Sequence, residues 1–270
     1  MGRVVLIVSD GLRDDTAREQ MGYLWHLVES RQASRYTVIA ELPTMSRPLY
    51  ETICTGTPVS VHGVTSTLVV RRSTMPNIFE QAVKHKHSTA AAAHYWFSEL
   101  YVRAPHNFVT DCEAEDPQGL IQHGRFYADD AMPDREVFTI GAHLIHRFAP
   151  DLALIHPMGM DYMGETHGSD SPEYRNNAIF QDVILATLIP QWKQAGYTIL
   201  ITADHGITND RMHGGIQPGN RHVPLYIVRP DGAGRGALTA QPSQLQLAPT
   251  VCRLLGVPIP ATMKRPPLRV

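Results

Sequence analysis

The first strand segment of this chain is apolar along its whole length instead of alternating between apolar and polar residues. Residues 4–8 are five consecutive aliphatic side chains. A strand has this composition when both faces of its sheet are covered, which is the usual condition of a parallel sheet. Further strands are predicted at residues 36–42, 88–94, 151–156, 197–203 and 223–228.

Patterns typical of helices lie between these strands. Apolar residues at helical spacing over 21–28 follow a capping-box pattern at 16–19. Pro190 is expected to kink or restart the helix that contains it. The alternation of strands and helices predicts an α/β fold: a doubly wound, mostly parallel central sheet with helices on both faces. Further helices are predicted near 46–56, 75–85, 134–148, 173–194 and 243–255.

The composition favours one globular domain. A chain of 270 residues with 43% apolar and 19% charged residues can bury a sizeable core. It contains no internal repeat, low-complexity tract or linker, so a single domain over residues 1–270 is predicted. Residues 103–133 hold more turn residues and acids than core residues, and a surface insertion is expected there.

Charge and cysteine content exclude several classes of protein. The net charge of −2 lacks the concentrated basic excess of a protein that coats nucleic acid. Cys54, Cys112 and Cys252 are widely spaced and predict neither a disulfide framework nor a thiolate zinc site. The apolar run before Asp10 is too short for a signal sequence or a membrane span. A soluble, cytoplasmic protein is therefore expected.

Polar side chains follow several of the predicted strands directly. Ligands of a doubly wound sheet bind outside the carboxyl ends of its strands, so these positions are the first candidates for a site. Carboxylate and imidazole groups gathered there can bind one cation together. Each residue taken singly has a plainer explanation, either a turn cap or a surface position. The candidates are Asp10, Asp161, Asp204, His205 and His213.

Ser46 lies where the strand at 36–42 gives way to a helix, and Pro48 suits the first turn of that helix. The hydroxyl group of Ser46 would lie beside free backbone N–H groups at the positive end of the helix, which is a natural position for a phosphate. The alternative is that Ser46 only caps the helix.

Taken in order, these motifs resemble those of the alkaline phosphatase superfamily, and most closely its nucleotide pyrophosphatase/phosphodiesterase branch. The resemblance extends over residues 4–228. Val-Ser-Asp-Gly at 8–11 resembles the family's first-strand metal aspartate, and Pro-Thr-Met-Ser-Arg-Pro at 43–48 resembles its nucleophile segment. Thr-Ala-Asp-His-Gly at 202–206 resembles its paired metal ligands, and His213 its last histidine.

The resemblance implies two divalent metal ions, with zinc or manganese expected and iron as a further candidate. One ion would be held by Asp10, Ser46, Asp204 and His205, and the other by Asp161, His213 and the residue four positions after Asp161.

That last residue is histidine in the family, whereas this chain has Glu165, with His167 two residues later. Glu165 is the first choice because it keeps the spacing, and His167 is the alternative. An additional carboxylate would favour manganese or iron over zinc.

Two residues depart from the branch's pattern, which has an aromatic residue before the proline and asparagine after it. Here Arg47 precedes Pro48 and Leu49 follows it. Leu49 cannot donate a hydrogen bond to a phosphate oxygen. Arg47 is therefore the candidate for phosphate binding, and its guanidinium would suit a terminal phosphate dianion. The alternative is a solvent-exposed arginine at the start of a helix.

The predicted function is that of a metal-dependent phosphoesterase. It would hydrolyse phosphodiester or nucleotide pyrophosphate bonds through a phosphoseryl intermediate on Ser46. The alternatives are a phosphomonoesterase or phosphonate hydrolase on the same site, or a metal-binding protein without turnover in which Glu165 marks a decayed site. The expected partner is a small phosphorylated substrate, with neither a nucleic-acid polymer nor a membrane.

Overall fold

The computed structural model describes residues 2–270, and within them the strands form one nine-stranded sheet. The order of the strands is β4-β5-β3-β6-β1-β7-β8-β2-β9. The five strands from β5 to β7 are parallel to one another, whereas β8 is antiparallel to both of its neighbours. The predicted α/β fold with a mostly parallel sheet is confirmed. The strands are β1 (Arg3–Val8), β2 (Ala33–Ile39), β3 (Thr89–His94), β4 (Glu113–Glu115), β5 (His123–Tyr127), β6 (Leu152–Ile155), β7 (Tyr197–Thr202), β8 (His222–Val228) and β9 (Gly236–Ala237).

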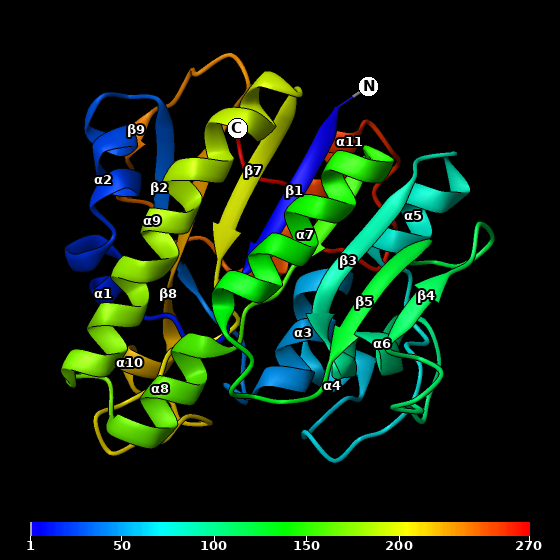
Figure 1. Ribbon diagram of the computed structural model, residues 1–270, viewed down its shortest axis with the longest axis horizontal. Helices are drawn as coiled ribbons and strands as arrows, with labels where there is room; N and C mark the ends of the chain where they lie inside the picture. The colour runs from blue at the N-terminus through cyan, green and yellow to red at the C-terminus, as the bar shows by residue number, and fades with distance from the viewer. Residues whose placement is uncertain (1) are drawn as a thin grey trace.

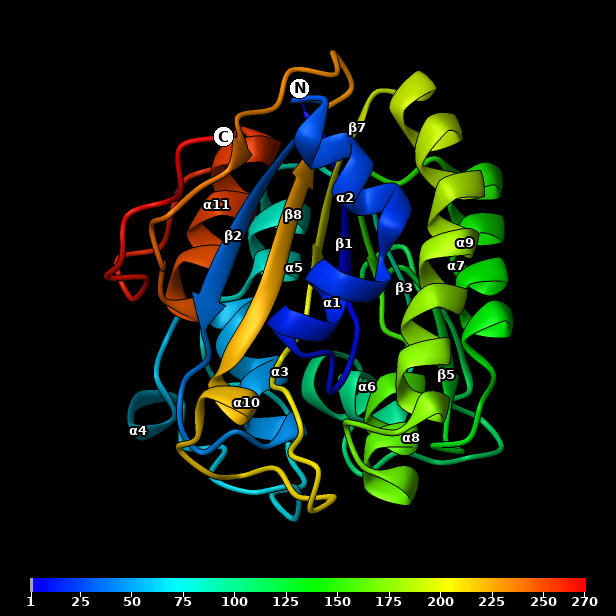
Figure 2. The same cartoon turned by 90° about the vertical axis from the view of Figure 1, so that its left-hand side faces the viewer.

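Helices cover both faces of the sheet (Figures 1 and 2). One face carries α1 (Asp14–Gln20), α2 (Gly22–Glu29), α7 (Asp134–Phe148) and α9 (Pro172–Gln194), and the other carries α3 (Ser46–Thr55), α5 (Ile78–Lys84) and α11 (Leu247–Leu255). The remaining helices are α4 (Val59–His62), α6 (Tyr95–Tyr101), α8 (Gly159–His167), α10 (Pro218–Arg221) and the short 3₁₀ turn Gln244–Gln246.

The central strand β1 explains the apolar run at the start of the sequence. It lies between β6 and β7, and Ile7 pairs with Ile155 on one side and Ile201 on the other. Residues 4–8 are all fully buried, since α11 covers one face of the strand and the α7–α9 layer lies over the other. The three parallel strands end at the same edge of the sheet, which brings the segments that follow them together.

Two helix predictions differ from the structure. The helix expected after residue 16 is two helices, because the backbone of Met21 (φ −93°, ψ 75°) is not helical and Gly22 starts the second. In contrast, α9 continues through Pro190 without a new start. Pro190 is exposed, so water can hydrate the carbonyl group that its ring leaves unpaired.

The segment at 103–133 belongs partly to the sheet. It contributes β4 and β5, and β5 pairs in parallel with β3. Ile121 and Phe126 are buried in the core. The expectation of a surface insertion missed these strands, because each is short and contains polar residues on its more exposed side.

Candidate metal-binding active site

The predicted site residues come from segments that follow neighbouring strands. Asp10 lies two residues after β1, and the Asp204-His205 pair follows β7. Asp161 lies in the first turn of α8, after β6, and Ser46 is the first residue of α3. Because β6, β1 and β7 are adjacent in the sheet, these segments converge at one edge.

The first predicted ligand set is assembled around His205. Its Nε2 atom lies 3.4 Å from Oδ1 of Asp10 and 3.3 Å from Oδ2 of Asp204. The Oγ atom of Ser46 lies 3.1 Å from the same nitrogen. Asp10, Asp204 and His205 are fully buried and place their ligand atoms within 4.8 Å of one another. Four side chains from three widely separated segments of the sequence therefore meet at one point.

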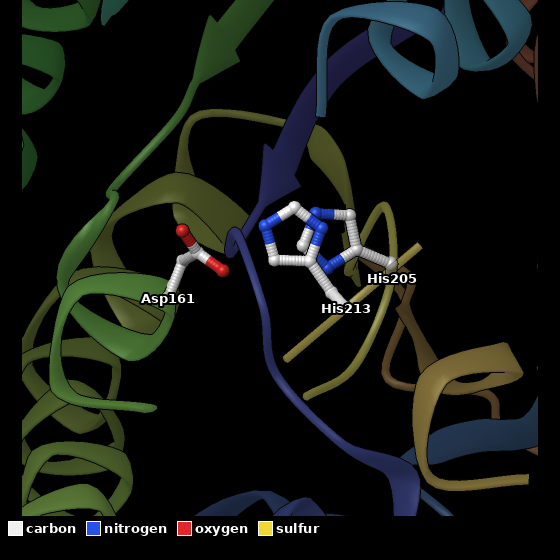
Figure 3. A group of neighbouring side chains, drawn as sticks. All are labelled: Asp161, His205 and His213. Atoms are coloured by element: carbon white, nitrogen blue, oxygen red, sulfur yellow. The ribbon is translucent and has the colours of Figure 1, made fainter. Parts of the chain in front are cut away.

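Asp161 and His213, from the second predicted set, lie beside the first set and form a group with its His205. The ligand atoms of Asp161, His205 and His213 lie within 4.8 Å of one another. Figure 3 shows the two imidazole rings side by side with the Asp161 carboxylate facing them, and the ring centroids of His205 and His213 are 4.3 Å apart. The structure thus brings together two adjoining groups of the residue types that bind divalent cations.

The structure favours Glu165 over His167 as the remaining member of this second set. On α8, Glu165 is four residues after Asp161 and lies on the same side of the helix. Its Oε1 atom is 3.1 Å from Nε2 of His213. Glu165 and His167 are both exposed, but His167 lies at the end of α8 on another side of the helix. Helical spacing explains the difference, because a residue six positions after Asp161 lies on another side of the helix.

Each of the three buried aspartates keeps one oxygen free. Oδ1 of Asp10, Oδ1 of Asp161 and Oδ2 of Asp204 are buried, and no described residue donates a hydrogen bond to them. Burial and the neighbouring Asp204 raise the pKa of Asp10 to about 7, and burial with the charge of Asp161 raises the pKa of Asp204 to about 7. Burial also raises the pKa of Asp161 well above its usual range. Buried carboxylate oxygens without hydrogen-bond donors fit a cation site, because a bound cation would compensate their negative charge.

The two histidines differ in charge. Burial lowers the pKa of His205 to about 4, so its ring is neutral and can bind a cation through nitrogen. Burial also disfavours the charged form of His213, but the hydrogen bond with Glu165 and the charge of Asp161 outweigh it and raise the pKa to about 9. A protonated His213 therefore compensates part of the acidic charge, and a cation would replace that proton.

The structure gives the Arg47 side chain protein partners in place of the predicted phosphate. Its side chain is 2% exposed, and NH1 lies 2.7 Å from Oε2 of Glu99. The guanidinium also donates to the carbonyl of Val69 and lies 4.9 Å from the ring centroid of Trp96. A buried ion pair with Glu99 thus occupies the group that a phosphate would need. Leu49 is buried in the core and makes no polar contact, as expected.

A structural role for Arg47 gives a testable outcome. Replacing Arg47 by Met should lower the free energy of unfolding by about 3–5 kcal/mol, because it leaves Glu99 buried without its partner. The double variant R47M/E99M should recover much of that loss, and turnover by folded R47M should stay close to that of the unchanged enzyme. Urea unfolding and phosphodiester assays measure both. A large loss of turnover at unchanged stability would restore the phosphate-binding role.

Two further residues contact Asp10, and only one of them, Tyr50, had no role suggested by the sequence. The Tyr50 hydroxyl donates to Oδ2 of Asp10, and Nε2 of His156 lies 3.2 Å from the same oxygen. Tyr50 is four residues after Ser46 on α3, so helical spacing could have indicated that it faces the site. His156 follows β6 directly, and its position suggested only a hydrogen-bonding partner for the ligands.

Gly11 is required by the close approach of two segments. Its φ is +74°, and a Cβ atom there would lie 2.7 Å from the Cα of Asp161. Its N–H donates to Oδ1 of Asp204 at 3.2 Å. The glycine after Asp10 therefore lets β1 and α8 bring their aspartates together.

Several known proteins are similar to this chain in sequence. The chain is 23% identical over 278 residues to GPI ethanolamine phosphate transferase 2 of Candida albicans, with 96% of this chain and 30% of that protein covered. It is likewise 23% identical over 274 residues to the human GPI ethanolamine phosphate transferase 2, catalytic subunit, with 96% and 27% covered. The chain thus spans less than a third of the length of these relatives. No helix among residues 2–270 combines the length and apolar character needed to cross a membrane.

Solved structures show the same fold. Murine ectonucleotide pyrophosphatase / phosphodiesterase 5 superposes with a TM-score of 0.73 at 13% identity, covering 95% of this chain and 96% of that one. The phosphonate monoester hydrolase of Silicibacter pomeroyi gives a TM-score of 0.66 at 15% identity, with 99% and 76% covered. The family described as type I phosphodiesterase / nucleotide pyrophosphatase matches residues 4–247. The chain therefore belongs to this family, in agreement with the resemblance of its sequence motifs.

Proposed function

We propose that the protein is a metal-dependent phosphodiesterase that cleaves phosphodiester or nucleotide pyrophosphate bonds through a phosphoryl intermediate on Ser46. One observation carries this proposal. The Ser46 hydroxyl lies 3.1 Å from His205, within a cluster of three buried aspartates that each keep one oxygen unpaired. Phosphoryl transfer through a serine requires its hydroxyl group to lie next to a cation site, and here His205 adjoins both.

The residues divide into two ligand sets for two divalent cations. Asp10, Ser46, Asp204 and His205 would hold one cation, and Asp161, Glu165 and His213 would hold the other. Bound divalent cations would lower the pKa of the Ser46 hydroxyl and neutralise charge on the phosphate oxygens. The arrangement of side chains supports a pair of sites, because His205 lies between the two groups.

The chain's own residues supply the nucleophile and its orientation. Ser46 opens α3, so its Oγ atom lies at the positive end of a ten-residue helix, where a phosphate is favoured. Attack by Oγ forms the bond to phosphorus and releases the alcohol of the substrate. Water then cleaves the bond between Oγ and phosphorus and regenerates Ser46.

The surroundings of Arg47 favour diesters over monoesters. A terminal phosphate dianion calls for an additional cationic donor, and the arginine expected to provide it is paired with Glu99. The ratio of kcat/KM for bis-p-nitrophenyl phosphate to that for p-nitrophenyl phosphate tests this, and a higher value for the diester is expected. Faster cleavage of the monoester, or of p-nitrophenyl phenylphosphonate, would favour the alternative phosphatase or phosphonate hydrolase.

The curated relatives favour a second candidate function. Both of those described above are transferases of ethanolamine phosphate, and each covers 96% of this chain. The same intermediate on Ser46 would serve transfer if an alcohol replaced water as the acceptor. Product analysis in the presence of added alcohols separates the two, because a transferase forms a new diester while a hydrolase forms the acid.

Glu165 leads to a prediction about metal preference. Two carboxylates and one imidazole form a harder ligand set than one carboxylate and two imidazoles, so the enzyme should be more active with Mn²⁺ than with Zn²⁺. Glu165→His should shift the preference toward Zn²⁺. Activity after metal removal and reconstitution measures it, with His167→Ala as the control that should change nothing. Equal metal preference in E165H and the unchanged enzyme would show that Glu165 is not a ligand.

The size of the substrate and the cellular location of the protein are also proposed. A groove borders Glu165 and offers room for a small substituent of the phosphate. We propose a small phosphorylated substrate, with no nucleic-acid polymer or membrane as partner, in the cytoplasm. The groove is lined by Ala128, Asp129, Asp130, Ala131, Tyr162, Glu165 and Thr166.

A further inference from the structure

The two oxygens of Asp10 have opposite surroundings. Oδ2 accepts the hydroxyl of Tyr50 and lies 3.2 Å from Nε2 of His156. Oδ1 is buried without a hydrogen bond from any residue of the described chain, and it lies 3.4 Å from Nε2 of His205. One oxygen is thus used by the protein, and the other is directed at the cluster of ligands.

We propose that Tyr50 and His156 are positioning residues that restrict Asp10 to binding a cation through Oδ1 alone. The inference rests on the proposed function, since it assigns a role within the same site. Two donors on Oδ2 use the lone pairs that a bidentate aspartate would offer to a cation. They also fix the rotation of the carboxylate, which places Oδ1 before any ligand arrives.

The ring of His156 is held in a defined orientation. The Tyr127 hydroxyl donates to the backbone carbonyl of His156 at 2.7 Å and lies 3.3 Å from Nδ1 of the ring. Because Nε2 faces a carboxylate oxygen, the proton of the neutral ring belongs on Nε2. His156 is then a hydrogen-bond donor to Asp10 in the same way as Tyr50.

The Tyr50 ring is equally constrained. It stacks on Phe97 with centroids 4.5 Å apart, and the His156 ring packs edge-on against it at 4.6 Å. All three side chains are fully buried. Tyr50 also shares α3 with Ser46, one helical turn away, so its hydrogen bond fixes the distance between the nucleophile's helix and the aspartate.

The direct test removes the Tyr50 hydroxyl and measures cation affinity. Tyr50→Phe should weaken the binding of one of the two Mn²⁺ ions by about 10–100-fold, the usual effect of losing a hydrogen bond to a metal ligand. The other ion should bind as in the unchanged protein. Titration of metal-depleted protein in competition with a chromogenic chelator resolves both affinities without any substrate.

A matched control is available in Tyr197. Its hydroxyl is also buried and donates to the carbonyl of Pro150 at 2.7 Å, at the start of β7 and away from the site. Tyr197→Phe should leave both affinities unchanged. Equal losses in Y50F and Y197F would overturn the proposal, because the effect would then follow from removing any buried hydroxyl.

A second pair of variants tests His156 independently and decides the matter if Y50F does not fold. Gln at position 156 can still donate from its amide, whereas Leu cannot. His156→Gln should keep most of the affinity, and His156→Leu should lose as much as Y50F. The double variant Y50F/H156L should lose less than the sum of the single losses, since both residues act on the same oxygen.

The outcomes separate this proposal from the proposed function. Unchanged affinities in Y50F and H156L, in an enzyme that cleaves diesters, would overturn the positioning role alone. If the affinities of the variants follow the expected order but the protein cleaves no phosphoester, the positioning role is supported and the proposed function is contradicted. A wild-type protein that binds no divalent cation would contradict both.

Discussion

Replacement of Ser46 by Ala should reduce turnover by about 10³-fold or more while both cations remain bound. Removal of a covalent nucleophile has effects of this size, because the two-step route through the intermediate is lost. Cation binding should persist, since Asp10, Asp204 and His205 still converge without the hydroxyl. Steady-state assays with a diester and metal analysis of the same preparation give both quantities.

Ser46→Thr is the matched control for this variant. It keeps a hydroxyl group at the start of α3. S46T should therefore retain measurable turnover. A fully active S46A would show that water attacks the phosphorus directly and would remove the covalent intermediate from the account.

Replacement of Asp204 by Asn should have the second large effect. It should weaken cation binding and turnover in the metal-loaded enzyme, but it should raise the stability of the metal-free protein. In the loaded enzyme, Asp204→Asn removes a charged ligand and should weaken cation binding and turnover by about 10–100-fold or more. The amide keeps the shape of the side chain and can still accept the hydrogen bond from the Gly11 N–H. Isothermal titration and diester assays measure the two losses.

In chelator-treated protein the same variant should be stabilising near neutral pH. Burial and the charge of Asp161 raise the pKa of Asp204 to about 7, above that of an unfolded aspartate. The folded state therefore binds a proton more tightly than the unfolded state, and ionisation of Asp204 costs stability as pH rises from about 4 through 7. D204N avoids that cost, so its Tm should exceed that of the wild type by roughly 5 °C or more at about pH 8. The difference should vanish near pH 4.

Asp134→Asn provides the contrast. Asp134 is also a buried aspartate, but it accepts hydrogen bonds from Gln181, Asn177 and the Gly159 N–H. The side-chain amide introduced by D134N would place its own N–H group against groups that also donate, so the variant should be destabilising near neutral pH. If D204N behaved like D134N in metal-free protein, the unpaired oxygens would not mark a cation site.

The fold was predictable where the sequence carries continuous apolar runs. Residues 4–8 are buried on both faces because β1 lies at the centre of the sheet, and their composition reflects that burial. The strands β4 and β5 carry no such run, because β4 is an edge strand with exposed residues and β5, beside it, alternates buried with partly exposed residues. The antiparallel direction of β8 depends on packing beside β7 and β2, which local patterns do not encode.

The site was predictable to the extent that its residues follow strands. Asp10, Asp204 and His205 lie just beyond β1 and β7, and the parallel sheet brings these positions together. The family resemblance added the ligand grouping. The ion pair of Arg47 was not predictable because its partner Glu99 belongs to α6, and no spacing in the sequence connects the two residues. His156 was expected only as a hydrogen-bonding partner near the ligands, and the contact of Tyr50 with Asp10 was missed because the two residues belong to separate segments.

The most direct test of the central claim is to trap the covalent intermediate. Metal-loaded enzyme is mixed with a diester substrate, quenched with acid during turnover, and digested for mass spectrometry. A covalent intermediate on Ser46 predicts a peptide in which that residue carries the phosphoryl group of the substrate, whereas S46A and metal-depleted enzyme should yield only the unmodified peptide. Product formation with Ser46 unmodified throughout, or a phosphoryl group on another residue, would contradict that intermediate.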